Sequence, residues 1–215
     1  MTSPAYVMVT DFDGTAAEYD VQQVILDALA DRDGWRGINR EWAAGRMTTA
    51  ERARAQWALI RGGERDVLKV LEPLELDPGF LTFVRLCEER GFPLYVVSDG
   101  FDFYIEPILK RAGLDYLPVF ANSLRYEHGA PRMSFLLQRS PDQYYGNDKT
   151  FVMEQVRRPG STLVFVGDGH SDRAAAHQAD LIFAKDRLAE YCEAQSLPFE
   201  RFATFDDISG YFRRR

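Results

Sequence analysis

The most constraining feature of this 215-residue sequence is an apolar run that ends directly in two acids. Residues 6–10 are apolar, aromatic or β-branched, which is typical of a buried strand. Asp11 and Asp13 follow at once, and Gly14 and Thr15 then turn the chain away. Two buried carboxylates repel each other unless a cation or hydrogen-bond donors compensate them. The pattern favours a strand that delivers acids to a cation site, with an ordinary Asp–Gly turn as the alternative.

Strands alternate with helical segments over most of the remaining chain. Further strands are expected at residues 92–97, 119–121, 162–166 and 181–184, with a hairpin-like pair at 124–127 and 133–137. The alternation predicts an α/β fold, a Rossmann-like three-layer α/β/α parallel sheet with right-handed crossovers. In such a sheet the ligand lies beyond the carboxyl ends of the strands. Ser98 and Asp168 come just after two of these strands, so they should meet the first acids there.

Residues 16–76 differ from the remainder, because they show helical periodicity and little strand character. We expect a small helical cap inserted after the first strand, so that residues 1–15 and 77–215 form the core. The alternative is that these helices simply pack on the core, since periodicity does not reveal what a helix face packs on. Three tryptophans of this region either form the core of the cap or line its pocket: Trp35, Trp42 and Trp57.

Composition narrows the classes of function. The chain has a net charge of -7, so it lacks the excess of basic residues that is typical of a nucleic-acid binder. Cys87 and Cys192 form neither a disulfide framework nor a zinc-ligand spacing, so a reducing cytoplasm is expected. No signal peptide and no apolar run of about 20 residues is recognisable, so no membrane partner is expected. An acidic protein that binds an anionic substrate needs a metal or local positive groups.

The polar residues near the strand ends form a set that can transfer a phosphoryl group. A carboxylate can attack phosphorus, and an acid two residues on can protonate the leaving oxygen and then activate water. Mg²⁺ held by carboxylates neutralises phosphoryl oxygens. Ser98, nearby backbone N–H groups and Lys149 can hold the remaining oxygens. Taken singly, Ser98 is more often a helix cap and Lys149 a solvated charge, so the argument depends on their joint placement.

These residues resemble the motifs of the haloacid-dehalogenase superfamily of phosphohydrolases. The four motifs match, in the family order, Asp11-Phe12-Asp13-Gly14-Thr15, Ser98, Lys149, and Gly167-Asp168-Gly169 with Asp172. The resemblance implies Asp11 as nucleophile and Asp13 as general acid and base. It implies Mg²⁺ bound by the Asp11 side chain, the Asp13 carbonyl and Asp168.

The same resemblance implies how the phosphate is held. Ser98 and Lys149 bind it, while Asp172 orients Lys149 or a metal-bound water and so joins the metal-site candidates. Asp20, nine residues past Asp11, falls where relatives place a cap residue that faces the substrate. Four more residues, two within the first motif and two directly after Ser98, are also expected at the bound phosphate: Gly14, Thr15, Asp99 and Gly100.

The helical region at 16–76 resembles the cap of the phosphoserine phosphatase-like branch. Residues 98–103 and 181–186 are most similar to phosphatases that act on the enol phosphate of methionine salvage. The expected activity is Mg²⁺-dependent hydrolysis of a small phosphorylated metabolite through an aspartyl-phosphate. The alternatives are a phosphatase for an amine-bearing ester, such as phosphoserine or phosphocholine, and a catalytically idle binding or regulatory protein. A monomer or homodimer is expected. Asp99 stands where these relatives usually have glycine.

Overall fold

The computed structural model describes residues 5–139 and 144–214. Over these residues one seven-stranded sheet has the order β4-β3-β2-β1-β5-β6-β7. Every neighbouring pair is parallel except β3 and β4, which form an antiparallel hairpin. The strands are β1 (Tyr6–Thr10), β2 (Leu94–Phe101), β3 (Val119–Glu127), β4 (Ala130–Ser134), β5 (Thr162–Gly167), β6 (Leu181–Ala184) and β7 (Glu200–Arg201).

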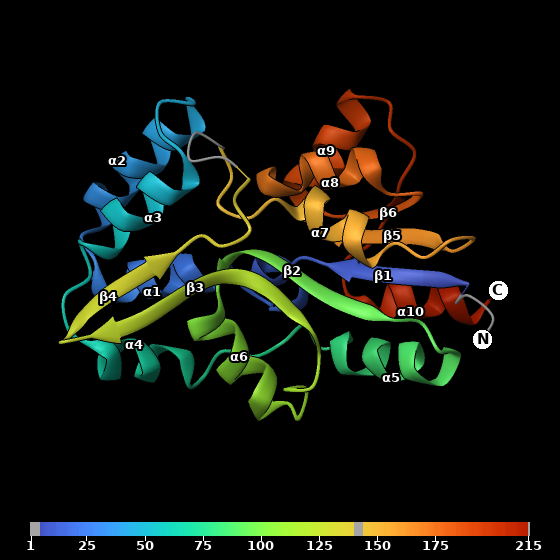
Figure 1. The fold of residues 1–215 in the computed structure, drawn as a ribbon, viewed down its shortest axis with the longest axis horizontal. Coiled ribbons are helices and arrows are strands. Elements are labelled where there is room, and N and C mark those ends of the chain that lie inside the picture. Colours follow the sequence, from blue (N-terminus) through green and yellow to red (C-terminus); the bar gives the residue numbers. More distant parts are fainter. Residues whose placement is uncertain (1–4, 140–143, 215) are drawn as a thin grey trace.

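Helices cover both faces of this sheet (Figure 1), which confirms the predicted three-layer α/β/α fold. On one face lie α5 (Phe80–Arg90), α6 (Asp102–Arg111) and α10 (Phe205–Arg213), and on the other lie α7 (Lys149–Val156), α8 (Arg173–Gln178) and α9 (Asp186–Ala194). Each face has its own buried apolar cluster, the first containing Phe80 and Phe205 and the second Val152 and Leu188. No helix in the described part of the chain has the length and apolar character needed to cross a membrane.

Strand β1 lies at the centre of the sheet, between β2 and β5. Residues Val7 to Val9 are fully buried because helices cover both faces, which explains why this strand is apolar throughout. All three central strands are parallel, so their carboxyl ends reach the same edge. The residues at the carboxyl ends of β1, β2 and β5 therefore meet at one place.

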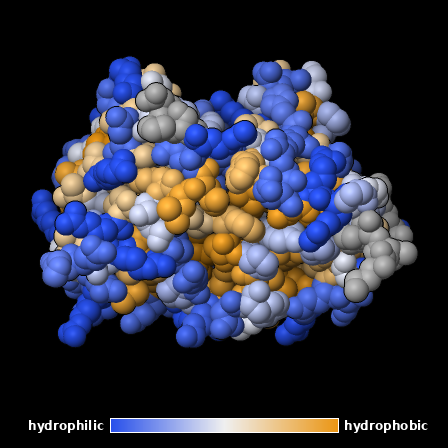
Figure 2. Space-filling model, viewed as in Figure 1, coloured by the Kyte–Doolittle hydropathy of each residue, from blue (hydrophilic) through white to orange (hydrophobic). Residues whose placement is uncertain are grey.

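Residues 16–76, here called the helical insert, leave the sheet after β1 and return before α5. They form α1 (Val21–Leu29), α2 (Arg32–Ala43), α3 (Thr49–Trp57) and α4 (Glu64–Leu71). The two ends of the insert lie side by side, since Ala17 bridges Leu76 and the Asp77 N–H donates to the Ala16 carbonyl at 2.9 Å. In Figure 1, α2 and α3 form one lobe and α8 and α9 another, and a hollow separates the same two lobes in Figure 2.

Several boundaries differ from the sequence-based expectation. Strand β2 begins at Leu94 and runs to Phe101 instead of spanning 92–97, and β4 is Ala130–Ser134 instead of 133–137. The sequence suggests a break at Gly34 and a short helix from Ile38, which is wrong. Helix α2 begins at Arg32 because the Asp31 carboxylate caps it, accepting from the Gly34 N–H at 2.7 Å. The third strand also runs beyond residue 121, because pairing with β4 extends it into the hairpin.

Asp77 joins the end of the insert to two core helices, which generates a stability prediction. Its buried Oδ1 accepts from the N–H of Gly79 at 2.9 Å and of Phe205 at 3.0 Å. Asp77→Ala leaves both donors without this partner, so we expect the free energy of unfolding to fall by about 2 kcal/mol. Asp77→Asn keeps a side-chain oxygen and should lose less. Urea denaturation measures both, and an alanine variant as stable as the parent would contradict the assignment.

Candidate active site

The turn after β1 brings its residues against the loop that follows β5. Gly14 has a φ of +70°, and a Cβ there would lie 2.9 Å from Asp168 Oδ2, so glycine alone fits both the backbone and the space. The Thr15 hydroxyl donates to Asp168 Oδ1 at 2.9 Å. Gly14 and Thr15, predicted at the phosphate, thus contact Asp168 and do not line the cavity described below.

A buried ammonium group connects three distant parts of the chain. Lys149, at the start of α7 and 3 % exposed, donates from Nζ to Asp11 Oδ1 at 2.6 Å and to Asp172 Oδ1 at 2.5 Å. Burial alone lowers the pKa of Lys149, but the two carboxylates outweigh it and hold the pKa above its usual value. Burial, together with repulsion from Asp172, raises the pKa of Asp11 well above its usual value, and Lys149 partly opposes this.

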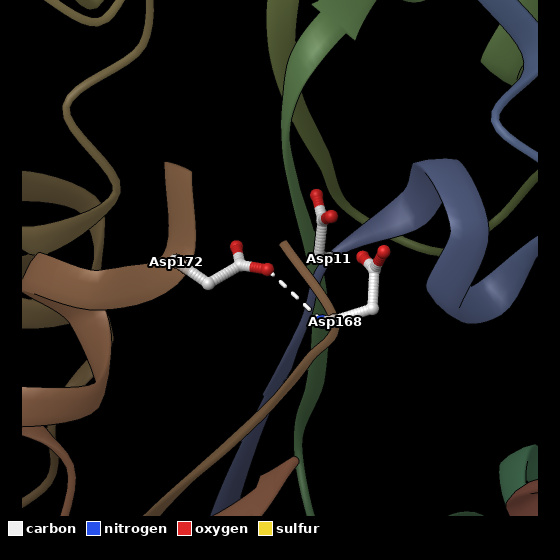
Figure 3. Close-up of side chains that lie close together, drawn as sticks. All are labelled: Asp11, Asp168 and Asp172. Carbon is white, nitrogen blue, oxygen red and sulfur yellow. Dashed lines mark hydrogen bonds between the residues drawn. The ribbon is translucent and has the colours of Figure 1, made fainter. Parts of the chain in front are cut away.

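Three aspartates lie close enough to share one cation. Asp11, Asp168 and Asp172 each offer a carboxylate oxygen, and these atoms all lie within 4.8 Å of one another. Figure 3 shows the Asp11 and Asp168 side chains side by side, with Asp172 pointing toward them from the left. The Asp172 carboxylate accepts from the N–H of Asp168 at 3.1 Å and of Gly169 at 2.9 Å.

The charge of this cluster fits a divalent cation. Three carboxylates face a single contacting lysine among the described residues, so negative charge remains in excess. Burial, then repulsion from Asp172, raises the pKa of Asp168 to about 7, which reflects the cost of this crowding. Carboxylate oxygens are the ligands that hard divalent cations prefer. Asp13, also predicted at the metal, does not bring its side chain into this group.

The Asp13 carboxylate points instead to the second strand and to the helical insert. It accepts hydrogen bonds from the Tyr104 hydroxyl at 3.0 Å, the Val21 N–H at 3.0 Å and the Ser98 hydroxyl at 3.3 Å. Burial, followed by repulsion from Asp20, raises the pKa of Asp13 to about 7. A carboxyl group with such a pKa can both donate and accept a proton near neutral pH.

The carboxyl-terminal part of β2 supplies Ser98, Asp99 and Gly100. The buried Ser98 hydroxyl accepts from the Gly100 N–H at 2.9 Å, and a Cβ on Gly100 would lie 2.5 Å from Asp13 Oδ2. Asp99 Oδ1 accepts from the Asn147 N–H at 2.8 Å, while its buried Oδ2 bonds to no described residue. Burial raises the pKa of Asp99, and the charge of Arg52 opposes the rise.

These residues open into a cavity of about 390 Å³ between the core and the helical insert. The core contributes Asp11, Asp13, Ser98, Asp99, Gly100 and Asp168, and the insert contributes Asp20, Gln22, Trp35, Asn39, Trp42, Arg52 and Gln56. Lys149 and Asp172 lie behind Asp11 and do not line the cavity. A larger cavity of about 780 Å³ lies beside β7 and α10, but none of the predicted site residues lines it.

The structure shows which tryptophans are packed in the interior and which line the cavity. It also places at the site residues that the sequence did not single out. Trp57 is buried and packs edge-on against Phe101, whereas Trp35 and Trp42 line the cavity. Tyr104 was missed because a tyrosine in an apolar helix stripe reads as core. Gln56 was missed because its partners lie on other helices, so no local spacing marks it.

A model of the haloacid dehalogenase-like hydrolase family matches residues 8–177. The 2-hydroxy-3-keto-5-methylthiopentenyl-1-phosphate phosphatase of Geobacillus kaustophilus is 30% identical over 214 residues, covering 97% of this chain and 96% of that protein. The phosphatase of the same name from Geobacillus thermodenitrificans is 29% identical over 212 residues, with coverages of 97% and 96%.

Solved structures resemble the chain in fold. A phospho-aspartyl intermediate analogue of phosphoserine phosphatase superposes with a TM-score of 0.68 at 21% identity, covering 88% of this chain and 91% of that chain. A phosphoserine phosphatase from T. onnurineus superposes with a TM-score of 0.69 at 19% identity, covering 97% and 94%. At these identities the likeness establishes the fold and not the substrate.

The buried ammonium of Lys149 generates a second stability prediction. Lys149→Met removes the cation that contacts Asp11 and Asp172, so two buried carboxylates lose their counter-charge. We expect the free energy of unfolding in the presence of a metal chelator to fall by about 3 kcal/mol. Lys110→Met, at an exposed position of α6, is the matched control and should change little. Equal stabilities of the two variants would show that the ammonium does not compensate the acids.

Proposed function

The chain belongs to the haloacid dehalogenase-like hydrolase family, and we propose that it hydrolyses a small phosphorylated metabolite through an aspartyl-phosphate, an acyl phosphate formed on Asp11. One observation carries this proposal. Lys149 holds Asp11 Oδ1 at 2.6 Å, while Asp11 Oδ2 makes no hydrogen bond to any described residue and Asp11 lines the cavity. The oxygen that remains available is therefore the one that can attack phosphorus.

In the first half of the reaction, a bond forms between Asp11 Oδ2 and phosphorus while the bond from phosphorus to the leaving oxygen breaks. Asp13 gives its proton to that leaving oxygen, since the raised pKa leaves part of the carboxyl protonated near neutral pH. In the second half, water attacks phosphorus and passes a proton to Asp13. The bond between phosphorus and Asp11 then breaks, and inorganic phosphate leaves.

Other residues hold the phosphoryl oxygens. Ser98 presents its hydroxyl beside Asp13, and the ammonium of Lys149 lies against the nucleophile. Asp172 fixes Lys149 and is itself fixed by two backbone N–H groups. We assign Ser98 and Lys149 to phosphate binding, and Asp172 to positioning Lys149.

We propose Mg²⁺ as the cation of the acidic cluster, held by Asp11, Asp168 and the backbone carbonyl of Asp13. When bound, it neutralises the phosphoryl oxygens and the nucleophile. Support comes from the excess of carboxylates over contacting cations, and from the raised pKa of both Asp11 and Asp168.

We propose that the helical insert is a cap, and that the substrate is the keto–enol phosphate named for the two Geobacillus relatives or a close analogue. The paired ends of the insert give it a narrow connection to the core, and its residues form one wall of the cavity. A cavity of about 390 Å³ suits a small metabolite. A cytoplasmic location fits the buried, unpaired Cys87 and Cys192.

The role of Asp13 predicts a dependence on the leaving group. Asp13→Asn cannot protonate the leaving oxygen, so kcat/KM should fall by about 10³-fold for an alkyl phosphate. The loss should be much smaller for p-nitrophenyl phosphate, whose leaving group needs no proton. Steady-state kinetics on both esters measure the difference. Asp11→Asn is the matched comparison, and its kcat/KM should fall equally for both esters. If kcat/KM of Asp13→Asn also fell equally for both esters, Asp13 would not be the acid.

The metal assignment predicts a shift in stability that does not depend on turnover. Millimolar MgCl₂ should raise the thermal midpoint of the parent protein, because a ligand that binds only the folded state stabilises it. Asp168→Asn removes a charged ligand and should abolish most of the rise. Asp115→Asn, at an exposed position, is the control that should respond as the parent does. An unchanged midpoint in the parent over a Mg²⁺ titration would reject the site.

A further inference from the structure

Three amide side chains from three helices of the insert form a chain of hydrogen bonds along the cavity wall. Gln22 Nε2 on α1 donates to Gln56 Oε1 on α3 at 2.9 Å, and Gln56 Nε2 donates to Asn39 Oδ1 on α2 at 2.9 Å. All three residues line the cavity that contains Asp11 and Asp13. This amide chain, Gln22–Gln56–Asn39, takes no part in the ester chemistry described above.

The amide chain has hydrogen-bonding capacity left at both ends. Gln56 is 1 % exposed and sits in the middle, whereas Gln22 and Asn39 are only half-buried. Gln22 Oε1 and Asn39 Nδ2 bond to no residue in the described part of the chain. The cavity wall therefore offers an acceptor at one end and donors at the other. Trp35, 3 % exposed, adds an indole N–H that has no described partner.

The insert supplies few charged residues to the same wall, although the buried Nε of Arg52 has no hydrogen-bond partner among the described residues. Asp20 and Arg52 are the two charged lining residues that the insert supplies in the described structure. The Asp20 carboxylate accepts from the Gln23 N–H at 2.8 Å, and the Arg52 guanidinium lies 4.1 Å from the centroid of the Trp42 ring. Neutral amides and indoles make up the rest of the polar wall. Hydroxyl and carbonyl groups can pair with such a wall without the cost of desolvating a charge.

We propose that the amide chain Gln22–Gln56–Asn39 is the leaving-group subsite. It selects phosphate esters whose leaving group carries uncharged hydroxyl or carbonyl groups, and it disfavours esters of amino acids and of choline. The inference rests on the proposed function, because it names the substrate class of the same site. The core then acts on the phosphoryl group, and the insert recognises the remainder of the molecule.

The test compares one ester of each kind with an ester that bypasses the subsite. Dihydroxyacetone phosphate has a hydroxyl and a carbonyl, O-phosphoserine has an ammonium and a carboxylate, and p-nitrophenyl phosphate has no hydrogen-bonding alcohol. The measured quantity is kcat/KM for dihydroxyacetone phosphate divided by kcat/KM for p-nitrophenyl phosphate. This ratio should fall about tenfold in Gln22→Leu and in Asn39→Leu, because each variant loses one or two neutral hydrogen bonds to the substrate. Gln155→Leu, at an exposed position of α7, is the control for the substitution.

A variant that introduces a charge tests the same claim through a gain of selectivity for an ester that carries an ammonium group. Gln22→Glu places a carboxylate at the half-buried end of the chain. The selectivity for phosphoethanolamine over dihydroxyacetone phosphate should rise about tenfold, because the new carboxylate pairs with the ammonium group.

The outcomes separate this inference from the proposed function. If kcat/KM for p-nitrophenyl phosphate and for dihydroxyacetone phosphate falls by the same factor in both leucine variants, the amide chain only joins the helices, and the inference is overturned. If the parent prefers O-phosphoserine and Arg52→Gln removes that preference, Arg52 forms an ionic subsite instead. If the parent hydrolyses none of the esters in the presence of Mg²⁺, the proposed function itself fails.

Discussion

The rest of the site depends on one ammonium group held between two buried carboxylates. Strand β1 lies at the centre of the sheet, so whatever follows it is taken out of water. Asp11 is placed there, and an isolated buried carboxylate would be neutral and a poor nucleophile. Lys149 partly offsets that cost by placing a positive charge against Asp11, and Asp172 fixes Lys149 from the other side. The sheet topology brings these residues together, because β1 and β5 are neighbours and α7 precedes β5.

The two acids after β1 have different surroundings and so can have different roles. Asp11 faces the ammonium of Lys149, whereas Asp13 faces neutral donors, Tyr104 and Ser98. Asp13 also accepts from the Val21 N–H at the start of the insert. The position of the insert therefore bears directly on the surroundings of Asp13. This contact would link the proposed recognition of the leaving group, on the insert, to the group proposed to protonate it.

Much of the fold could be predicted from the sequence, and the reason is local. Buried strands such as residues 6–10 and 181–184 are short apolar runs with clear ends, and the structure has them as β1 and β6. The start of α2 was not predictable in this way, because Asp31 caps a turn that contains Gly34, a residue that usually ends helices. The short edge strand β7 has two exposed residues and carries no pattern.

The site residues also divide into those that local sequence patterns predict and those that depend on tertiary packing. Acids and glycines at strand ends can be recognised in the sequence from their spacing. The structure brings together the residues predicted in this way, Asp11, Asp168, Asp172 and Lys149. The amide chain across α1, α2 and α3 could not be predicted, because each of its hydrogen bonds joins residues whose proximity depends on how three helices pack. The motifs point to the residues of the proposed chemistry, whereas the amide-lined wall of the cavity can be seen only in the tertiary structure.

The central claim is that phosphorus becomes bonded to Asp11. The most direct measurement is to mix the Asp13→Asn variant with p-nitrophenyl phosphate and Mg²⁺, quench with acid, and map the modified peptide by mass spectrometry. The account predicts one phosphoryl group per chain, on the peptide that contains residue 11, and none when Asp11 is also replaced by Asn. Continued release of p-nitrophenol with no phosphoryl group on that peptide, or with the group on another residue, would contradict it.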